Sequence, residues 1–190
     1  NTTEKWSGSS WSTTSALNVA RQALAGCGDV TNALSFGGYT GGYVGTTEKW
    51  SGSAWATTSN LNVGRGYLAG CGDVNNALSF GGYTGGYVNT TEKWSGSSWT
   101  ITSNLNVGRY SLAGCGDVTN ALSFGGTTGS YVGTTERYST NLRNLKLKFN
   151  LSHYYSPGVW SVTSSLNQAR GYLAGCGDVN NALSFGGYTG

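Results

Sequence analysis

Residues Arg65 to Gly85 read RGYLAGCGDVNNALSFGGYTG, and residues Arg170 to Gly190 repeat these 21 residues without a change. Near-copies of the same segment begin at Arg21 and Arg109. A repeated unit must bury its apolar side chains against its neighbours, so a fixed-period repeat indicates the architecture of a whole chain. The sequence therefore predicts a single domain over residues 1–190, built from four copies of one structural unit.

The composition favours short strands joined by tight turns. Gly occupies 32 of the 190 positions and Pro only 1, while aromatic residues make up 13% of the chain. Trp, Tyr and Thr favour strands, and Gly permits tight turns. The aromatic content also supplies the apolar burial that disordered chains lack. We therefore expect an all-β fold.

Each unit has room for four strands. Its single cysteine recurs every 44 residues in the first three units, at Cys27, Cys71 and Cys115. In the unit that begins at Arg65, the expected strands cover residues 65–72, 77–82, 90–94 and 99–103, separated by turn-forming Asp, Asn, Gly and Ser. Four short antiparallel strands in a unit of this length are typical of a β-propeller blade.

Three motifs in each unit resemble kelch repeats. An Arg precedes a strand of small residues (Arg65 to Cys71), an apolar strand ends in a double glycine (Leu78 to Gly82), and two aromatic residues follow. Those aromatics, which we expect in the core, are Trp6, Trp50, Trp94 and Tyr138, then Trp11, Trp55, Trp99 and Trp160. The resemblance covers nearly the whole chain and implies a β-propeller of four kelch-like four-stranded blades. In style, the TTEKW, SGSSW and SFGG segments are also similar to kelch-like proteins of phage tails and marine microbes.

The order of the strands predicts how such a ring closes. The chain begins with third and fourth strands (residues 2–15) and finishes with first and second strands (residues 170–187). We therefore expect a ring closed by the N- and C-terminal strands, with Thr2 to Trp6 paired to Ala182 to Gly186. An open four-blade fragment and a ring shared between chains are the alternatives.

The charges cancel within the repeats. Each unit carries one Glu, one Asp, one Arg and one further base, and the surplus of +3 comes from Arg143, Lys146 and Lys148. A body without a basic face is a poor nucleic-acid binder, so we expect no nucleic-acid partner. No apolar run approaches the roughly 20 residues that span a bilayer, so we expect no membrane insertion.

Two sets of repeated residues are candidates for ligand binding. The kelch resemblance places the Arg of each unit near one mouth of the central channel, where it can contact an acidic ligand. The alternative is that each Arg pairs with a Glu, such as Glu48 or Glu92, and so ties strands or blades together. The tyrosines that follow the double glycine lie on the loop between strands two and three, where exposed Tyr beside Gly and Thr suits a binding surface or a sugar site. Their alternative role is packing between blades. The candidates are Arg21, Arg65, Arg109 and Arg170, with Tyr39, Tyr83, Tyr188, Tyr43, Tyr87 and Tyr131.

Catalytic and metal-binding groups are scarce. His153 is the only histidine, so no repeated Ser-His-Asp arrangement is possible and we expect no enzyme activity. Cys27, Cys71, Cys115 and Cys176 occupy one repeat position, which favours buried thiols over disulfides. Four thiolates would form a zinc ligand set, but structural zinc sites usually draw on close cysteine pairs. The sequence therefore predicts no metal and no cofactor.

One segment breaks the symmetry. Residues 139–159 replace a four-residue SGSS turn between strands three and four of the last complete repeat. Apolar and polar side chains alternate along its centre, as in an amphipathic strand that could dock a partner. The docking candidates are Leu145, Lys146, Leu147, Lys148 and Phe149. The alternative is a neutral loop insertion.

These features together predict a non-catalytic binding or structural module. We expect a surface-exposed recognition domain of the phage-fibre or microbial-adhesin type, at an extracellular or virion-surface location. Its ligand would be a protein or a glycan, and homo-oligomers or larger surface assemblies are possible. The alternative function is a carbohydrate-binding lectin with one site per blade.

Overall fold

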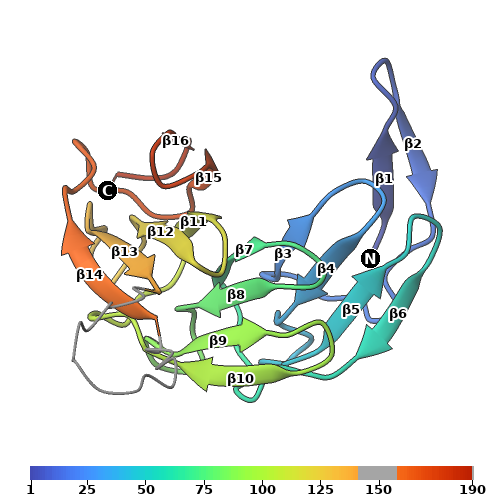
Figure 1. The fold of residues 1–190 in the computed structure, drawn as a ribbon, viewed down its shortest axis with the longest axis horizontal. Helices are drawn as coiled ribbons and strands as arrows, with labels where there is room; N and C mark the ends of the chain where they lie inside the picture. The colour runs from blue at the N-terminus through green and yellow to red at the C-terminus, as the bar shows by residue number, and fades with distance from the viewer. Residues whose placement is uncertain (141–157, 190) are drawn as a thin grey trace, which may run out of the picture.

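The computed structural model describes residues 1–140 and 158–189, and these residues form an all-β structure without helices. Figure 1 shows five sheets following one another around an open arc. Three complete four-stranded antiparallel sheets occupy the middle of the arc, and a two-stranded sheet lies at each end. The predicted all-β class and the four-stranded repeat unit are therefore confirmed.

The strands recur at equivalent positions in each unit. The N-terminal sheet consists of β1 (Thr3–Trp6) and β2 (Trp11–Thr14). The first complete sheet contains β3 (Ala25–Gly28), β4 (Ala33–Phe36), β5 (Thr47–Trp50) and β6 (Trp55–Thr58). The second contains β7 (Ala69–Gly72), β8 (Ala77–Phe80), β9 (Thr91–Trp94) and β10 (Trp99–Thr102). The third contains β11 (Ala113–Gly116), β12 (Asn120–Phe124), β13 (Thr135–Ser139) and β14 (Val159–Thr163). The C-terminal sheet consists of β15 (Ala174–Gly177) and β16 (Ala182–Phe185).

Local sequence sets the turns between these strands. In the second complete sheet, the backbone N–H groups of Asn75 and Asn76 donate to Oδ1 of Asp73, at 2.7 and 2.9 Å. An Asp side chain that accepts bonds from the following residues mimics a backbone turn, so Asp73 fixes the hairpin between β7 and β8.

The double glycine allows adjacent sheets to approach each other. Gly81 and Gly82 have φ angles of 65° and 113°, which side chains rarely permit. A Cβ at Gly81 would lie 2.8 Å from the carbonyl oxygen of Arg109 in the next unit. The N–H of Gly82 donates to that same carbonyl. The glycine pair is therefore required for backbone contact between neighbouring sheets.

The core lies between the sheets. The first strands of successive units, β3, β7, β11 and β15, contact one another in sequence. Leu34 and Phe36 of β4 pack on an apolar wall of the next unit, formed by Val74, Ala77, Trp94 and Trp99. The same arrangement recurs one unit further along, where Phe80 meets Trp160 edge to face. Each sheet therefore buries one face against its successor.

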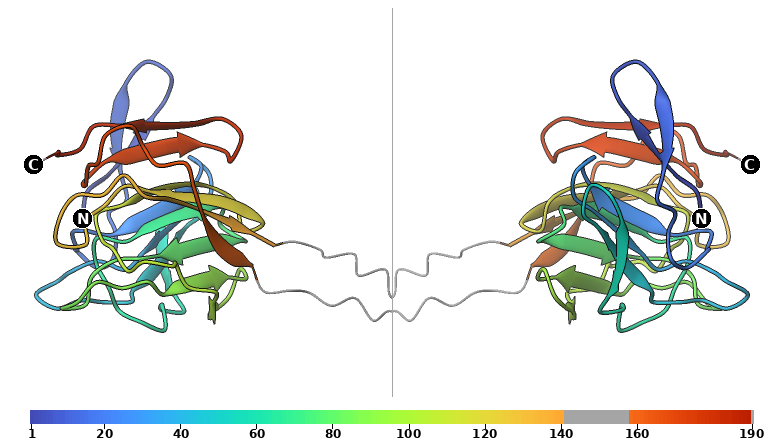
Figure 2. Two further views of the ribbon diagram at one scale, coloured as in Figure 1. Left: turned by 90° about the vertical axis from the view of Figure 1, so that its left-hand side faces the viewer. Right: turned by 90° about the vertical axis from the view of Figure 1, so that its right-hand side faces the viewer.

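The predicted closure of the ring is wrong for this structure. β1 pairs only with β2, and β16 pairs only with β15, so Thr2–Trp6 does not meet Ala182–Gly186. The two terminal sheets lie at opposite ends of the arc (Figure 1). Figure 2 shows the β1–β2 hairpin (blue) projecting from the body of the molecule.

The open ends change the expected core. Trp50, Trp94, Trp99, Tyr138 and Trp160 are buried as predicted. By contrast, Trp6 and Trp11 are exposed and Trp55 is half-buried, because the N-terminal sheet lacks two strands and no sheet before it supplies the Phe that covers Trp99 and Trp160 in later units. The expectation that Trp6 and Trp11 lie in the core is therefore wrong.

The exceptional segment begins where the sequence places it. β13 ends at Ser139 and β14 begins at Val159, so the insertion joins the third and fourth strands of the last complete sheet. The docking candidates Leu145, Lys146, Leu147, Lys148 and Phe149 lie outside the described residues. In the part of the chain that the structure describes, no helix has the length and apolar character needed to cross a membrane.

Candidate functional site

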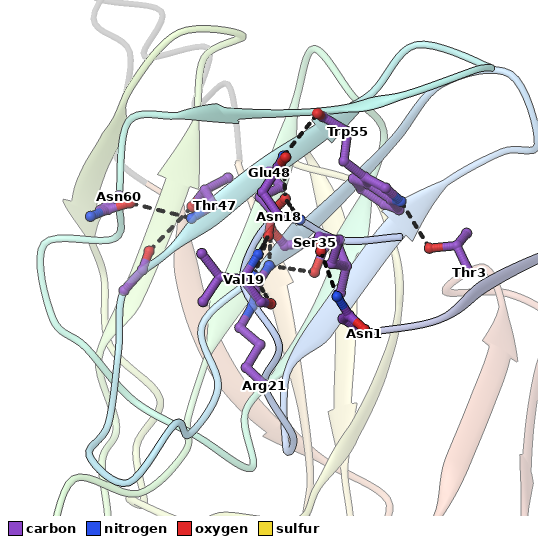
Figure 3. Close-up of polar contacts among 12 residues, drawn as sticks. Asn1, Thr3, Asn18, Val19, Arg21, Ser35, Thr47, Glu48, Trp55 and Asn60 are labelled. Atoms are coloured by element: carbon purple, nitrogen blue, oxygen red, sulfur yellow. Dashed lines mark hydrogen bonds and ion pairs between the residues drawn. The ribbon is translucent and has the colours of Figure 1, made fainter. Parts of the chain in front are cut away.

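A buried polar network ties the strands of each complete sheet together, and Figure 3 shows the network of the first complete sheet. In the first sheet, Arg21 Nη1 donates to Glu48 Oε1 on β5, and Arg21 Nη2 donates to Ser35 Oγ on β4 at 2.7 Å. Glu48 also accepts bonds from the backbone N–H and side-chain amide of Asn18. The network joins the connector before the first strand to the second and third strands.

The network repeats with little change. Arg65 pairs with Glu92 at 2.9 Å, and Arg109 pairs with Glu136 at 2.6 Å. All side chains in these ion pairs, including Arg21 and Glu48, are fully shielded from solvent. Burial lowers the pKa of Arg65, and the neighbouring Glu92 partly offsets that effect. Burial raises the pKa of Glu48, but hydrogen bonds from Arg21, Asn18 and Val19 outweigh it and leave the pKa below its ordinary value.

These placements assign the first three arginines a structural role. A guanidinium with no exposed side-chain surface presents nothing to a ligand, and the Arg–Glu pairing weighed from the sequence is the arrangement found. Arg170 differs from its three equivalents. It donates to Ser184 Oγ at 2.8 Å, but among the described residues it has no carboxylate partner.

The candidate tyrosines lie beside the residues that follow each Arg. Isolated bridges join Gly66 to Tyr83 and Tyr83 to Tyr87, with equivalent bridges in the other units. The loop between the second and third strands therefore folds back next to the start of the first strand. This arrangement places the loop tyrosines of successive units near one another.

Eight tyrosines form one connected group, which we name the tyrosine surface. It comprises Tyr39, Tyr43, Tyr67, Tyr83, Tyr87, Tyr110, Tyr172 and Tyr188. Along the line from Tyr39 through Tyr43, Tyr83, Tyr110 and Tyr172, ring centroids are 5.2 to 6.5 Å apart. Tyr87 stacks on Tyr110 with an interplanar angle of 12°. All eight rings are partly or largely exposed.

Three of these residues, Tyr67, Tyr110 and Tyr172, were not predicted from the sequence. We expected the first strand to begin at the Arg of each unit. That expectation makes the tyrosines just after the Arg part of the strand and not candidates for ligand binding. The structure begins that strand four residues later. Tyr67 and Tyr172 instead adopt φ angles of 56°, as Ala23 and Ser111 nearly do at the equivalent positions.

A ladder of backbone hydrogen bonds explains this unusual conformation. The N–H of Tyr67 donates to the carbonyl of Ala23, that of Ser111 donates to Tyr67, and that of Tyr172 donates to Ser111, each at 2.8 Å. A non-glycine residue in the left-handed region is costly and persists where its surroundings require it. Here the ladder between units supplies that requirement and holds Tyr67 and Tyr172 in place.

A pocket opens at the C-terminal end of the tyrosine surface. Its volume is about 480 Å³, and aromatic rings and hydroxyl groups dominate its lining. The lining residues are Tyr110, Thr127, Gly129, Ser130, Tyr131, Tyr172 and Thr189. The predicted Tyr131 thus joins the tyrosine surface at this pocket.

The four cysteines are free thiols. Cys71 and Cys115 are buried, as expected, whereas Cys27 is half-buried and Cys176 is exposed. The exposure of Cys176 corrects the expectation for that position, since β15 has no following first strand to cover it. Across residues 1–140 and 158–189, no group of three or more His, Cys, Asp or Glu side chains is close enough to hold a metal ion.

No protein-family model matches this sequence, and a search of curated proteins finds none with significant similarity.

Proposed function

We propose that the chain is a non-catalytic binding module of the kelch-like propeller type, whose tyrosine surface recognises a protein or a glycan. Its role would be that of a surface-exposed recognition domain, as in a phage fibre or a microbial adhesin, at an extracellular or virion-surface location. The observation that carries the proposal is the continuity of the tyrosine surface across successive units.

The chemistry of this surface suits recognition. Tyrosine offers a large contact area at a small cost in conformational entropy, and neighbouring Ser, Thr and Gly supply adaptable hydrogen bonds. Burial and neighbouring tyrosines raise the pKa values of Tyr43 and Tyr110, which keeps both phenols neutral and able to donate hydrogen bonds. The rings of neighbouring units also contact one another, so the same cluster contributes to packing between sheets.

The pocket at Tyr110 and Tyr172 favours a second candidate, a carbohydrate-binding lectin. Aromatic rings stack on sugar faces, while the hydroxyls of Thr127, Ser130 and Thr189 lie within the same pocket. Because the tyrosines of neighbouring units contact one another, a shared site fits this surface better than four separate sites.

A glycan array probed with the 190-residue chain tests whether this surface recognises glycans. Bound glycans would support the lectin, and Tyr110→Ala and Tyr172→Ala should each weaken that binding about tenfold or more, as for central aromatic contacts. Val162→Ala, at an exposed position on the outer strand β14, is the matched control and should bind normally. Glycan binding that both tyrosine variants retain would contradict the proposed site, and hydrolysis of an arrayed glycan would contradict a non-catalytic role.

A further inference from the structure

The two terminal sheets are complementary halves of one complete sheet. β15 and β16 are first and second strands, whereas β1 and β2 are third and fourth strands. Their sequences match those of paired strands elsewhere in the molecule. β16 reads ALSF like β4 and β8, and β1 reads TEKW like β5 and β9.

The C-terminal half exposes side chains that its equivalents bury. Leu183 and Phe185 of β16 are 68% and 53% exposed, whereas Leu78 and Phe80 of β8 are 0% exposed. The four residues occupy equivalent positions in identical 21-residue segments. Fully burying side chains of this kind is favourable by about 1.5 to 3 kcal/mol each. The C-terminal sheet therefore presents an apolar face with a strong tendency to be covered.

The N-terminal end carries a pocket suited to that face. The pocket has a volume of about 510 Å³, and its lining includes Val30, Ala33, Trp50 and Trp55. These positions are equivalent to the wall of Val74, Ala77, Trp94 and Trp99 on which Leu34 and Phe36 pack. Val30 is 48% exposed, whereas Val74 is 8% exposed. The pocket therefore lies where a Leu and a Phe from a second strand pack in the complete units.

The polar groups of the two ends are complementary as well. Arg170 and Ser184 form half of the buried network described above, at 2.8 Å from each other. Glu4 on β1 occupies the position of Glu48, Glu92 and Glu136, yet it is exposed. Within the described residues, neither Arg170 nor Glu4 forms an ion pair. Each end thus holds the charge that the other end lacks.

We propose that β16 of one copy of this chain pairs with β1 of a second copy, so that the two terminal sheets form one complete four-stranded sheet across the junction. The register follows β4 and β5, where Ala33 meets Trp50 and Phe36 meets Thr47. Ala182 therefore meets Trp6 of the second copy, and Phe185 meets its Thr3. Leu183 and Phe185 enter the pocket at Val30 and Trp50, and Arg170 pairs with Glu4. This junction forms whether or not the tyrosine surface binds a ligand.

A second copy is the occupant for two reasons. It carries both missing halves with the required sequence and charge, as the complete sheets demonstrate. The same chain, by contrast, keeps its two halves apart, since β1 pairs only with β2 and β16 only with β15 (Figures 1 and 2). Trp55 donates to Thr3 Oγ1 at the N-terminal end, and Leu173 packs on Phe124 at the C-terminal end. A junction between copies preserves both contacts.

The junction also covers the exposed tryptophans. Phe36 meets Trp99 edge to face with centroids 5.0 Å apart, and Phe80 meets Trp160 in the same way. In the next equivalent contact, Phe124 meets Trp11 of the second copy. The interface is heterologous, since different surfaces of the two copies meet, and it leaves one open end of each kind available to further copies.

Sedimentation and light scattering on the purified chain test this proposal. We expect the mass to rise with concentration from 19.8 kDa to at least twice that value. Glu4→Lys and Arg170→Ala each spoil a different end, and each should weaken association about 30-fold or more, as expected for truncating a buried charge pair. Ser12→Lys, at an exposed position on β2, is the matched control and should associate normally.

Mixing the two end variants separates a junction between copies from closure within one chain. E4K retains a normal β16 end and R170A retains a normal β1 end, so an equimolar mixture has one intact junction per pair of chains. We expect a complex of one copy of each variant that grows no further. A wild-type mass of 19.8 kDa at every concentration, or a mixture that remains monomeric, would overturn the proposal. Formation of the mixed complex itself shows that both variants are folded.

Discussion

At the scale of single residues, one carboxylate position has two environments. Glu48, Glu92 and Glu136 are buried and paired with arginine, whereas Glu4 is exposed at the equivalent position. Removing one partner of a buried ion pair leaves the other charge without compensation, and this is far more damaging than removing an exposed charge. The chain thus contains its own control for the energetic role of this network.

Glu92→Ala should lower the free energy of unfolding by about 3 to 5 kcal/mol, because it leaves the buried Arg65 guanidinium unpaired. Glu4→Ala should change it by less than about 0.5 kcal/mol in dilute solution, as expected of an exposed site. Urea unfolding of both variants, at concentrations too low for association, measures the difference. Equal losses in the two variants would show that the network does not stabilise the sheet.

Acid should destabilise the fold through the same network. The pKa of Glu48 lies below its ordinary value of 4.5 in the folded chain. Because the unfolded carboxyl binds its proton at higher pH, this contribution is present above about pH 4.5 and is lost as the pH falls through the folded value. The urea midpoint should therefore fall between about pH 6 and about pH 3. Glu48→Gln should start from lower stability and show a smaller acid dependence; an unchanged dependence would contradict this assignment.

At this scale the sequence predicts part of the site. The equal numbers of Arg and Glu in the repeats indicated that an ion pair was possible, and the structure contains three. The roles of Tyr67 and Tyr172 could not be predicted, because no residue pattern signals a left-handed tyrosine. That conformation depends on a hydrogen bond from a neighbouring unit, which local sequence does not specify.

At the scale of elements, the solvent exposure of each first strand depends on the first strands of the neighbouring units. β7 lies between β3 and β11, whereas β15 contacts β11 at the end of the series. Hence Cys71 is buried and Cys176 is exposed, although both lie in the same 21-residue sequence. Burial, assisted by nearby Asp73, raises the pKa of Cys27 to about 12, and burial raises that of Cys71 well above its ordinary value.

Thiol alkylation should therefore differ sharply between equivalent cysteines. The thiolate is the reactive form, so a buried thiol with a raised pKa reacts slowly. At about pH 8, iodoacetamide should label Cys176 at least about tenfold faster than Cys71 in dilute native protein. Peptide mass spectrometry distinguishes the two sites through the residues that flank each segment. Equal labelling in native protein, with both sites fast, would mean that β7 is not shielded by its neighbours.

Strand positions were the most predictable elements. Alternation, turn residues and the repeat located four strands per unit, and the structure confirms each of them in the complete sheets. The first strand was predicted too long, since the single Gly66 does not signal that the strand begins only at Ala69. The interrupting feature is the backbone of Tyr67, which again depends on contacts between units.

At the scale of the whole molecule, the predicted closure within one chain was wrong for a physical reason. The sequence specifies that a strand like β16 can pair with β1. The β16 strand of any copy of the chain meets that requirement, because every copy has the same ALSF sequence there. Whether the partner belongs to the same chain depends on how the successive sheets are placed relative to one another, and the sequence of one unit does not specify that placement.

The exact duplication of residues 65–85 and 170–190 also makes each segment a reference for the other. The intrinsic rate at which a backbone amide exchanges its hydrogen with solvent depends on the adjacent side chains, and these are the same within the two segments. The ratio of measured exchange rates at Leu78 and Leu183 therefore reports directly the difference in local opening free energy. In dilute native protein Leu183 should exchange faster, since β16 has one neighbouring strand and β8 has two. As the concentration rises, the proposed junction covers β16, and the exchange rate at Leu183 should fall towards the rate at Leu78. How closely the two exchange rates agree then depends on how often the copies join and separate.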